Sequence, residues 1–214
     1  MTATTPRRAL IVIDVQNEYF TGNLQIEYPP PAESLANIGR LMDAATAAKI
    51  PVIVIQQNSP ADAPAFAQGS NGWQLHDEVG RRHRDAYFGK PLPSAFSDTG
   101  LSDWLVEQGI DTLTVSGYMT HNCNDTTIKH AFDRGMAVEF VHDASGSVPY
   151  SNRAGSATAE EIHRVLAVVE QSRFAAVLTT DEWLHCIANG EAPVRENILV
   201  SYRQALALRS AKAA

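Results

Sequence analysis

The sequence predicts a single α/β domain with a doubly wound, Rossmann-like sheet of mostly parallel strands and helices on both faces. Short, continuous apolar runs at 9–13, 52–55 and 137–141 are typical of strands that are buried on both faces. An amphipathic helical pattern over 33–49 lies between the first two runs. This βαβ order joins parallel strands by a right-handed crossover. Strand and helix patterns continue to alternate along the chain, which favours the doubly wound class.

The later elements follow the same alternation, with one long interruption. Residues 56–85 are rich in Asn, Gly, Pro and Ala, and a loop of that length in a compact domain is usually functional or hides short elements. The two prolines of 87–93 exclude a regular helix there. In order, we expect a helix over 101–108, a strand over 112–115, a helix that begins at or near Cys123 and stops at Gly135, and a loop over 145–156. After these we expect a helix opened by a capping box at Thr158, a strand over 174–178, a helix that Thr180 or Asp181 caps and that runs through Ile187, and a helical tail.

Length and composition indicate one soluble globular domain spanning 1–214. The chain has 44% hydrophobic and 19% charged residues, which are ordinary values. Its net charge of −7, without a basic stripe, argues against nucleic-acid binding. The polar N-terminus and the lack of a membrane-length apolar run argue against a membrane partner, and two cysteines are too few for a disulfide framework. We therefore expect a cytoplasmic protein.

The segment GYMTHNCNDTT (117–127) connects a predicted strand to a predicted helix. It places Cys123 at or near the first turn of that helix, where unpaired N–H groups and the helix dipole favour an anion and can lower a thiol pKa. Asp14 likewise follows the first strand. Because active sites in doubly wound folds gather at the carboxyl ends of strands, Asp14 and Cys123 are candidates for one site. The alternatives are a small buried hydrophobic residue at Cys123 and a helix-capping carboxylate at Asp14.

Three dispersed motifs resemble those of the isochorismatase-like cysteine hydrolases. They are ALIVIDVQNEYF, FGKPLPSAFSDTGLSDWL and VSGYMTHNCNDTTIKHAFDRGMAVEFVHDA, and they occur in the family's order between Ala9 and Leu184. That superfamily includes nicotinamidases, isochorismatases, and maleamate and N-carbamoyl amidohydrolases. Three motifs in order are far more specific than any one of them, so the chain is identified as a member of this superfamily.

The resemblance implies a catalytic triad of Asp14, Lys90 and Cys123. In this scheme Cys123 attacks an amide carbonyl, and the resulting thioester is hydrolysed by water. Asp14 takes the thiol proton and delivers it to the departing amine. Lys90 stabilises the thiolate and the carboxylate. Taken alone, Lys90 would be assigned as a solvated surface lysine.

The resemblance also implies an oxyanion hole and a cis peptide bond beside the nucleophile. By position, the backbone donors are Met119 and Cys123, and the cis bond joins Tyr118 to Met119. Donors of this kind are typically worth about a hundred- to a thousand-fold in rate.

Departures from the family pattern argue against a metal and against nicotinamidase activity. Metal-dependent nicotinamidases carry an Asp-x-His pair after the second strand, where this chain has Gln56-Gln57-Asn58-Ser59. His76 and His83 occur later and are expected on a helix at the surface. No ligand set is recognisable, so no metal or other cofactor is expected.

The substrate pocket can be outlined only in part. Tyr19 matches a family aromatic that lines the site. The other candidate walls are Phe20, Trp73, Tyr87, Tyr118 and His121. Each aromatic has ordinary core packing as its alternative. His121 replaces the family's usual aspartate and is expected to pack against the loop, Asn124 and Asp125 are expected only to start the helix, and Cys186 is expected to be structural.

These features favour a cofactor-free hydrolase that acts on an amide or carbamoyl C–N bond of a small molecule. Two alternatives remain open: an isochorismatase-type vinyl ether hydrolase that uses Asp14 as acid, and a redox-sensing thiol protein on the same scaffold. The intact set of Asp14, Lys90 and Cys123 counts against a sensor. The resemblance implies a homodimer or homotetramer, with contacts through a tail of about 190–214.

Overall fold

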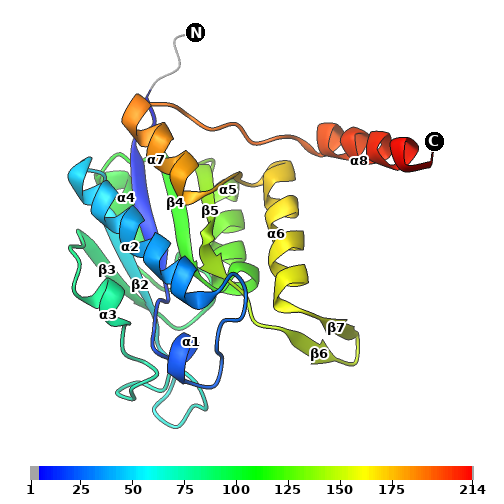
Figure 1. Cartoon of the computed structure of the whole chain (residues 1–214). Helices are drawn as coiled ribbons and strands as arrows, with labels where there is room; N and C mark the ends of the chain where they lie inside the picture. Colours follow the sequence, from blue (N-terminus) through cyan, green and yellow to red (C-terminus); the bar gives the residue numbers. More distant parts are fainter. Residues whose placement is uncertain (1–4, 214) are drawn as a thin grey trace.

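Six parallel strands form the central sheet. They are β1 (Arg8–Ile13), β2 (Val52–Gln57), β3 (Ala86–Lys90), β4 (Thr112–Tyr118), β5 (Ala137–Gly146) and β8 (Ala176–Leu178). In this computed structural model, which describes residues 5–213, the strand order is β3-β2-β1-β4-β5-β8 (Figure 1). Every neighbouring pair is parallel. The predicted fold class is therefore confirmed.

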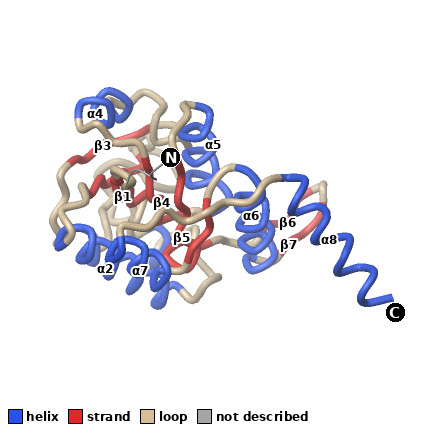
Figure 2. The backbone as a smooth tube through the Cα atoms, turned by 90° about the horizontal axis from the view of Figure 1, so that it is seen from above, coloured by secondary structure: helices blue, strands red, loops and turns tan. Residues whose placement is uncertain are grey.

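Helices cover both faces of this sheet (Figure 2). One face carries α2 (Pro31–Ala47) and α7 (Thr180–Asn189), and the other carries α4 (Leu101–Glu107), α5 (Asp125–Asp133) and α6 (Ala159–Arg173). The smaller elements are α1 (Glu18–Thr21), α3 (Asp77–Gly80), a π-helical turn η1 (Thr120–Asn124), the strands β6 (Tyr150–Asn152) and β7 (Gly155–Ala157) of an antiparallel hairpin, and α8 (Ile198–Ala213).

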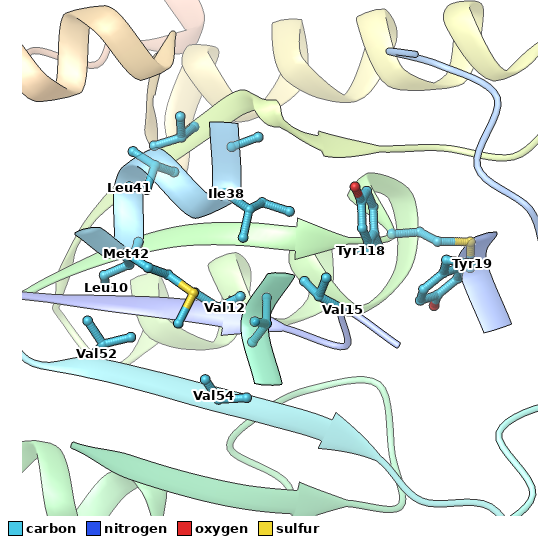
Figure 3. Close-up of a cluster of buried hydrophobic side chains, with 14 of the residues drawn as sticks. Leu10, Val12, Val15, Tyr19, Ile38, Leu41, Met42, Val52, Val54 and Tyr118 are labelled. Atoms are coloured by element: carbon cyan, nitrogen blue, oxygen red, sulfur yellow. The ribbon is translucent and has the colours of Figure 1, made fainter. Parts of the chain in front are cut away.

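Each face of the sheet has its own hydrophobic core. On the α2 face, Leu10, Val12 and Val54 project from neighbouring strands toward Ile38 and Met42 of α2 (Figure 3). All five side chains are fully buried. Burial of one such side chain contributes roughly 1.5–3 kcal/mol, so the apolar runs and the helical stripe read from the sequence account for this layer.

Three elements differ from the sequence-based expectations. Residues 86–90 form the edge strand β3, and the prolines that argued against a helix lie just beyond it. The predicted loop at 145–156 contains the end of β5 and the β6–β7 hairpin. The helix α7 starts one residue early because Thr179, not Thr180 or Asp181, is its N-cap.

The chain ends in a helix that stands away from the body. An extended segment, 191–197, leads from α7 to α8, which projects outward beside α6 (Figure 1). Among residues 5–213, none of the helices is long and apolar enough to cross a membrane.

A buried ion pair fixes the amino-terminal end of the sheet. The guanidinium of Arg8 on β1 lies 2.8 Å from the Glu139 carboxylate on β5, and both side chains are buried. Glu139 also accepts hydrogen bonds from Thr114 Oγ1 and from the indole of Trp183. The pair thus ties three strands to α7, and loss of one charge would leave the other buried and unpaired.

Replacing Arg8 by Met should lower the free energy of unfolding by about 3–5 kcal/mol, because Glu139 would keep a buried charge without a partner. Adding Glu139→Gln should recover much of this loss, since a neutral amide still accepts from Thr114 and Trp183. Urea denaturation of both variants measures the effect. Equal losses in the single and the double variant would contradict this interpretation.

Candidate active site

The candidate site lies where the strand order reverses, between β1 and β4. Ligands in open α/β sheets bind beyond the carboxyl ends of the strands at this point. Asp14 follows β1 directly and has a φ of 52°, in the left-handed region. A non-glycine residue there costs of order 1–3 kcal/mol and is often found at functional sites. The Asp14 carboxylate is fully buried at the carboxyl end of β1.

Gly117 lets β4 approach β1 at this edge. It pairs with Ile13 in the sheet register, and its φ is 100°. A Cβ atom at Gly117 would lie 2.1 Å from the Ile13 carbonyl oxygen. Only glycine fits both restrictions, so the residue before the nucleophile turn is fixed by backbone packing.

The ammonium of Lys90 joins the three predicted catalytic residues. It lies 2.8 Å from Asp14 Oδ2 and 3.2 Å from Cys123 Sγ. It also donates to Gln57 Oε1 at 2.7 Å, so each of its three N–H groups has a partner. Lys90 is fully buried at the end of β3, and Cys123 is 4% exposed. A surface role for Lys90 is therefore wrong.

Burial and neighbouring charges both shift the pKa values of Asp14 and Lys90. Burial raises the pKa of Asp14, and the adjacent Lys90 ammonium opposes that rise. Burial lowers the pKa of Lys90, but Asp14 and Cys123 outweigh it, so this pKa lies above its ordinary value. A carboxylate with a raised pKa beside a protonated lysine is suited to accept a proton near neutral pH.

The pKa of the Cys123 thiol is higher than the sequence predicts. Burial raises its pKa, the Asp14 charge adds to the rise, and Lys90 only partly opposes it. The residue sits in the π-helical turn η1, ahead of α5, rather than in the exposed first turn of an α-helix. The expected lowering of the thiol pKa was therefore wrong: burial raises it, which favours the uncharged thiol.

A buried hydrogen-bond network holds the turn that carries Cys123. Asn124 Nδ2 donates to the Gly117 carbonyl and to Ser145 Oγ, both at 2.8 Å. Ser145 Oγ lies 2.7 Å from Thr120 Oγ1, which lies 2.9 Å from His163 Nδ1. Asn124 is thus a clamp between β4 and β5, and the expectation that it merely starts a helix was wrong. The sequence gave no signal for this, because Ser145 and His163 are remote in the chain.

The peptide bond between Tyr118 and Met119 is cis, at the position that the resemblance indicated. The Met119 carbonyl accepts from the N–H groups of Asn122 and Asn124 at 3.1 and 3.2 Å. These bonds orient the backbone immediately before Cys123. Use of the Met119 and Cys123 N–H groups as an oxyanion hole stays a prediction.

Three of the aromatic residues predicted to line the pocket, Tyr19, Phe20 and Tyr118, pack against one another. Tyr19 packs against Phe66 and Tyr118, with ring centroids 5.1 and 5.4 Å apart, and Phe20 packs against Tyr118. Tyr118 is fully buried, and its hydroxyl lies 2.9 Å from Ser34 Oγ. Burial raises the pKa of Tyr19, with further contributions from Cys123 and Asp14. Tyr19 therefore lies within electrostatic reach of the triad, whereas Tyr118 anchors the core.

Trp73 and Tyr87 anchor the long loop and the sheet edge. The Trp73 indole donates to Asn58 Oδ1 at 2.7 Å, and its carbonyl accepts from Gln16 and Gln56. Tyr87 is exposed on the edge strand, and its hydroxyl donates to Gln56 Oε1. The structure gives neither side chain a contact with the triad.

His121 and Tyr150 form a second wall on the β6–β7 side. His121 Nδ1 lies 3.0 Å from Ser147 Oγ, and its ring stands perpendicular to that of Tyr150 with centroids 4.9 Å apart. Burial lowers the pKa of His121 to about 4, so the ring is neutral. Burial, and next the Cys123 charge, raise the pKa of Tyr150. Tyr150 is a residue near the site that sequence reasoning missed, because its segment resembled a polar loop.

The remaining histidines and cysteine have structural surroundings. His76 caps α3, accepting from the Glu78 N–H, and stacks on Phe20. His83 lies beyond α3 and pairs with Asp85. Neither lies within a helix, contrary to expectation. Cys186 is a buried free thiol on α7.

Comparisons with known proteins identify the family. A family model described as the isochorismatase domain matches residues 8–182. A crystal structure of an isochorismatase-family protein from Burkholderia xenovorans is 61% identical, covers 97% of this chain and 100% of its own, and has a TM-score of 0.96. A secreted isochorismatase effector of Verticillium dahliae is 34% identical over 68% of this chain and 75% of that protein. The ureidoacrylate amidohydrolase of Methylobacterium radiotolerans is 28% identical over 75% of this chain and 72% of that protein.

The chain therefore belongs to the isochorismatase family, and the resemblance in its sequence is confirmed. It is an enzyme of this family of hydrolases, whose relatives include amidohydrolases.

Replacing Asn124 by Ala should lower both stability and turnover. The change leaves the buried Gly117 carbonyl without its side-chain donor, at a cost of about 1–3 kcal/mol, and frees the Cys123 turn to move. Asn37→Ala is the matched control, because the Asn37 amide on α2 likewise donates to a backbone carbonyl, that of Asp143 on β5. Thermal unfolding and kcat measure the two effects. If both variants lose stability and neither loses turnover, Asn124 has no positioning role.

Proposed function

We propose that this enzyme hydrolyses an amide or carbamoyl C–N bond of a small molecule through a thioester on Cys123. The observation that carries the proposal is the Lys90 ammonium, which lies 2.8 Å from Asp14 and 3.2 Å from Cys123 in a buried site. A nucleophile, a base and a fixed cation in contact are the parts that acyl transfer requires. Similarity to a ureidoacrylate amidohydrolase supports the same bond class.

In the first half-reaction, Asp14 takes the Cys123 thiol proton as sulfur attacks the carbonyl carbon. Backbone N–H groups of Met119 and Cys123 stabilise the oxyanion, an arrangement worth about 10²–10³ in rate. The tetrahedral intermediate collapses when its C–N bond breaks. Asp14 delivers its proton to the leaving nitrogen, which departs as ammonia or an amine.

In the second half-reaction, water attacks the thioester and Asp14 accepts one of its protons. The C–S bond then breaks, a carboxylic or carbamic acid is released, and the proton returns to sulfur. Lys90 keeps its charge throughout, because its raised pKa holds the ammonium protonated. It therefore acts as a fixed electrostatic partner and not as a proton carrier.

Burial of the triad favours a small substrate. Cys123 is almost fully enclosed, and it contributes to the raised pKa of both Tyr19 and Tyr150, which supports placing both rings near it. Aromatic side chains beside an enclosed thiol suit a compact, planar acyl group. Because Cys123 must stay a free thiol, we place the enzyme in the reducing cytoplasm.

Replacing Cys123 by Ala should lower ammonia or amine release by about 10⁴-fold or more, because no thioester can form. The assay uses a panel of amides, ureides and carbamoyl compounds, with and without a chelator. Cys186→Ala, which removes a buried thiol on α7, should keep its activity. Ammonia or amine release that survives loss of Cys123 would refute the thioester route, and loss of turnover with chelator would indicate a metal site.

The rate should fall as the pH decreases through the raised pKa of Asp14, since only the carboxylate accepts the thiol proton. This acidic limb of kcat/KM should lie above the ordinary aspartate pKa of 3.8. Lys90→Met removes the cation that lowers this pKa, so its limb should move to higher pH. The exposed Lys49→Met is the control. Where turnover is too slow to measure, the rate of Cys123 alkylation is followed against pH instead. An acidic limb at the same pH in Lys90→Met and wild type would refute the role of Lys90.

A further inference from the structure

Gln57 and Lys90 are paired residues at the carboxyl ends of two neighbouring strands. Gln57 ends β2, and Lys90 ends β3 opposite it in the parallel register. Side chains of paired residues lie on the same face of a sheet, so both extend toward the site from one edge. Gln57 Oε1 accepts from Lys90 Nζ at 2.7 Å, the shortest of the three contacts of this ammonium, which lies 2.8 Å from Asp14 and 3.2 Å from Cys123.

The orientation of the Gln57 amide is fixed at its other end. Its Nε2 donates to the Pro91 carbonyl at 3.2 Å and to the Asn58 carbonyl at 3.3 Å. A reversed amide would place an NH2 group against the Lys90 ammonium and an oxygen against two carbonyl oxygens. The amide oxygen therefore faces Lys90, and the third N–H of this fully buried ammonium has an acceptor.

A second glutamine, Gln16, fixes the backbone of Gln57. Gln16 Oε1 accepts from the Gln57 N–H at 2.9 Å, and Gln16 Nε2 donates to the Gln57 carbonyl at 3.0 Å. The register of β1 with β2 ends where Ile13 pairs with Ile55, two residues before Gln57. The Gln16 side chain then takes the place of a neighbouring strand, because its amide supplies both the donor and the acceptor that the Gln57 backbone needs.

Gln57 acts on both charged residues of the site. Burial raises the pKa of Asp14, and the groups that oppose this rise include Lys90 and the Gln57 N–H. The side chain of Gln57 meets Lys90 with a neutral oxygen, which accepts a hydrogen bond without adding a second negative charge beside Asp14. The backbone of Gln57 thus favours the ionised base, while its side chain holds the cation.

We propose that Gln57 is a positioning residue of the reaction, which holds the Lys90 ammonium where it meets Asp14 and Cys123 together. This role rests on the proposed function, in which Lys90 acts as a fixed cation. Three acceptors define the position of Nζ, whereas with two of them the ammonium can rotate and shift. A neutral amide suits this role better than a carboxylate, because it fixes the cation without competing with Asp14 for its charge.

Removal of the amide oxygen tests the positioning. Gln57→Met keeps the length of the side chain but has no acceptor for Lys90, and it should lower kcat by about 10- to 100-fold with little change in KM, because the cation is free to shift. Gln171→Met is the matched control, since Gln171 on α6 likewise accepts through Oε1 and donates through Nε2, in both cases with backbone groups. The control should lose stability and keep its kcat. Equal kcat values in Gln57→Met and wild type would overturn the proposal.

Addition of a charge at the same position gives a test that needs no substrate. Gln57→Glu keeps an oxygen for Lys90, but its carboxylate shares the ammonium with Asp14, so the acidic limb of the pH profile should move to higher pH. The limb is measured as the rate at which iodoacetamide alkylates Cys123, in a Cys186→Ala background that leaves one thiol. A shifted limb in an enzyme that turns over no amide would support the role of Gln57 and reject the proposed reaction. A limb at the wild-type pH would show that Gln57 does not position Lys90.

Discussion

The contact on which the site depends is the buried ammonium of Lys90. An isolated charge in a protein interior is costly, and Lys90 is stable there because Asp14, Gln57 and Cys123 receive its three N–H groups. These partners come from β1, β2 and the turn after β4, while Lys90 itself ends β3. The site therefore forms only when the carboxyl ends of these strands are aligned, and a shift in strand register would leave the buried Lys90 charge without a partner.

The same alignment explains the restrictions on the nucleophile turn. Gly117 permits close approach to Ile13, and Asn124 binds the Gly117 carbonyl while it reaches Ser145 on β5. The thiol of Cys123 is thus placed by backbone packing on one side and by a buried amide on the other. Burial raises the pKa of this thiol, so the proposed reaction requires a base close to it. Asp14 is that candidate base, because Lys90 contacts both Asp14 and Cys123.

The sequence predicted some residues of this site and not others. Asp14 and Cys123 follow strongly apolar strands, so their places at the strand ends were readable from pattern alone. Lys90 was found only through the family resemblance, because its edge strand is short, carries a glycine and is followed by prolines. Tyr150 was missed, since the hairpin that carries it is polar and gains its position from tertiary contacts. The network of Asn124, Ser145 and His163 could not be read, because its members meet only in the folded chain.

A groove of about 510 Å³ between α6 and α8 shares one residue, His163, with the hydrogen bonds of the turn that carries Cys123. His163 lines the groove, and its Nδ1 lies 2.9 Å from Thr120 Oγ1 in the turn that carries Cys123. Burial lowers the pKa of His163 to about 4, so its ring is neutral and one nitrogen accepts a hydrogen bond. A chain from Asn124 through Ser145 and Thr120 to His163 then gives the Asn124 amide and both hydroxyls an acceptor, whereas His163 Nε2 is buried without a partner among the described residues.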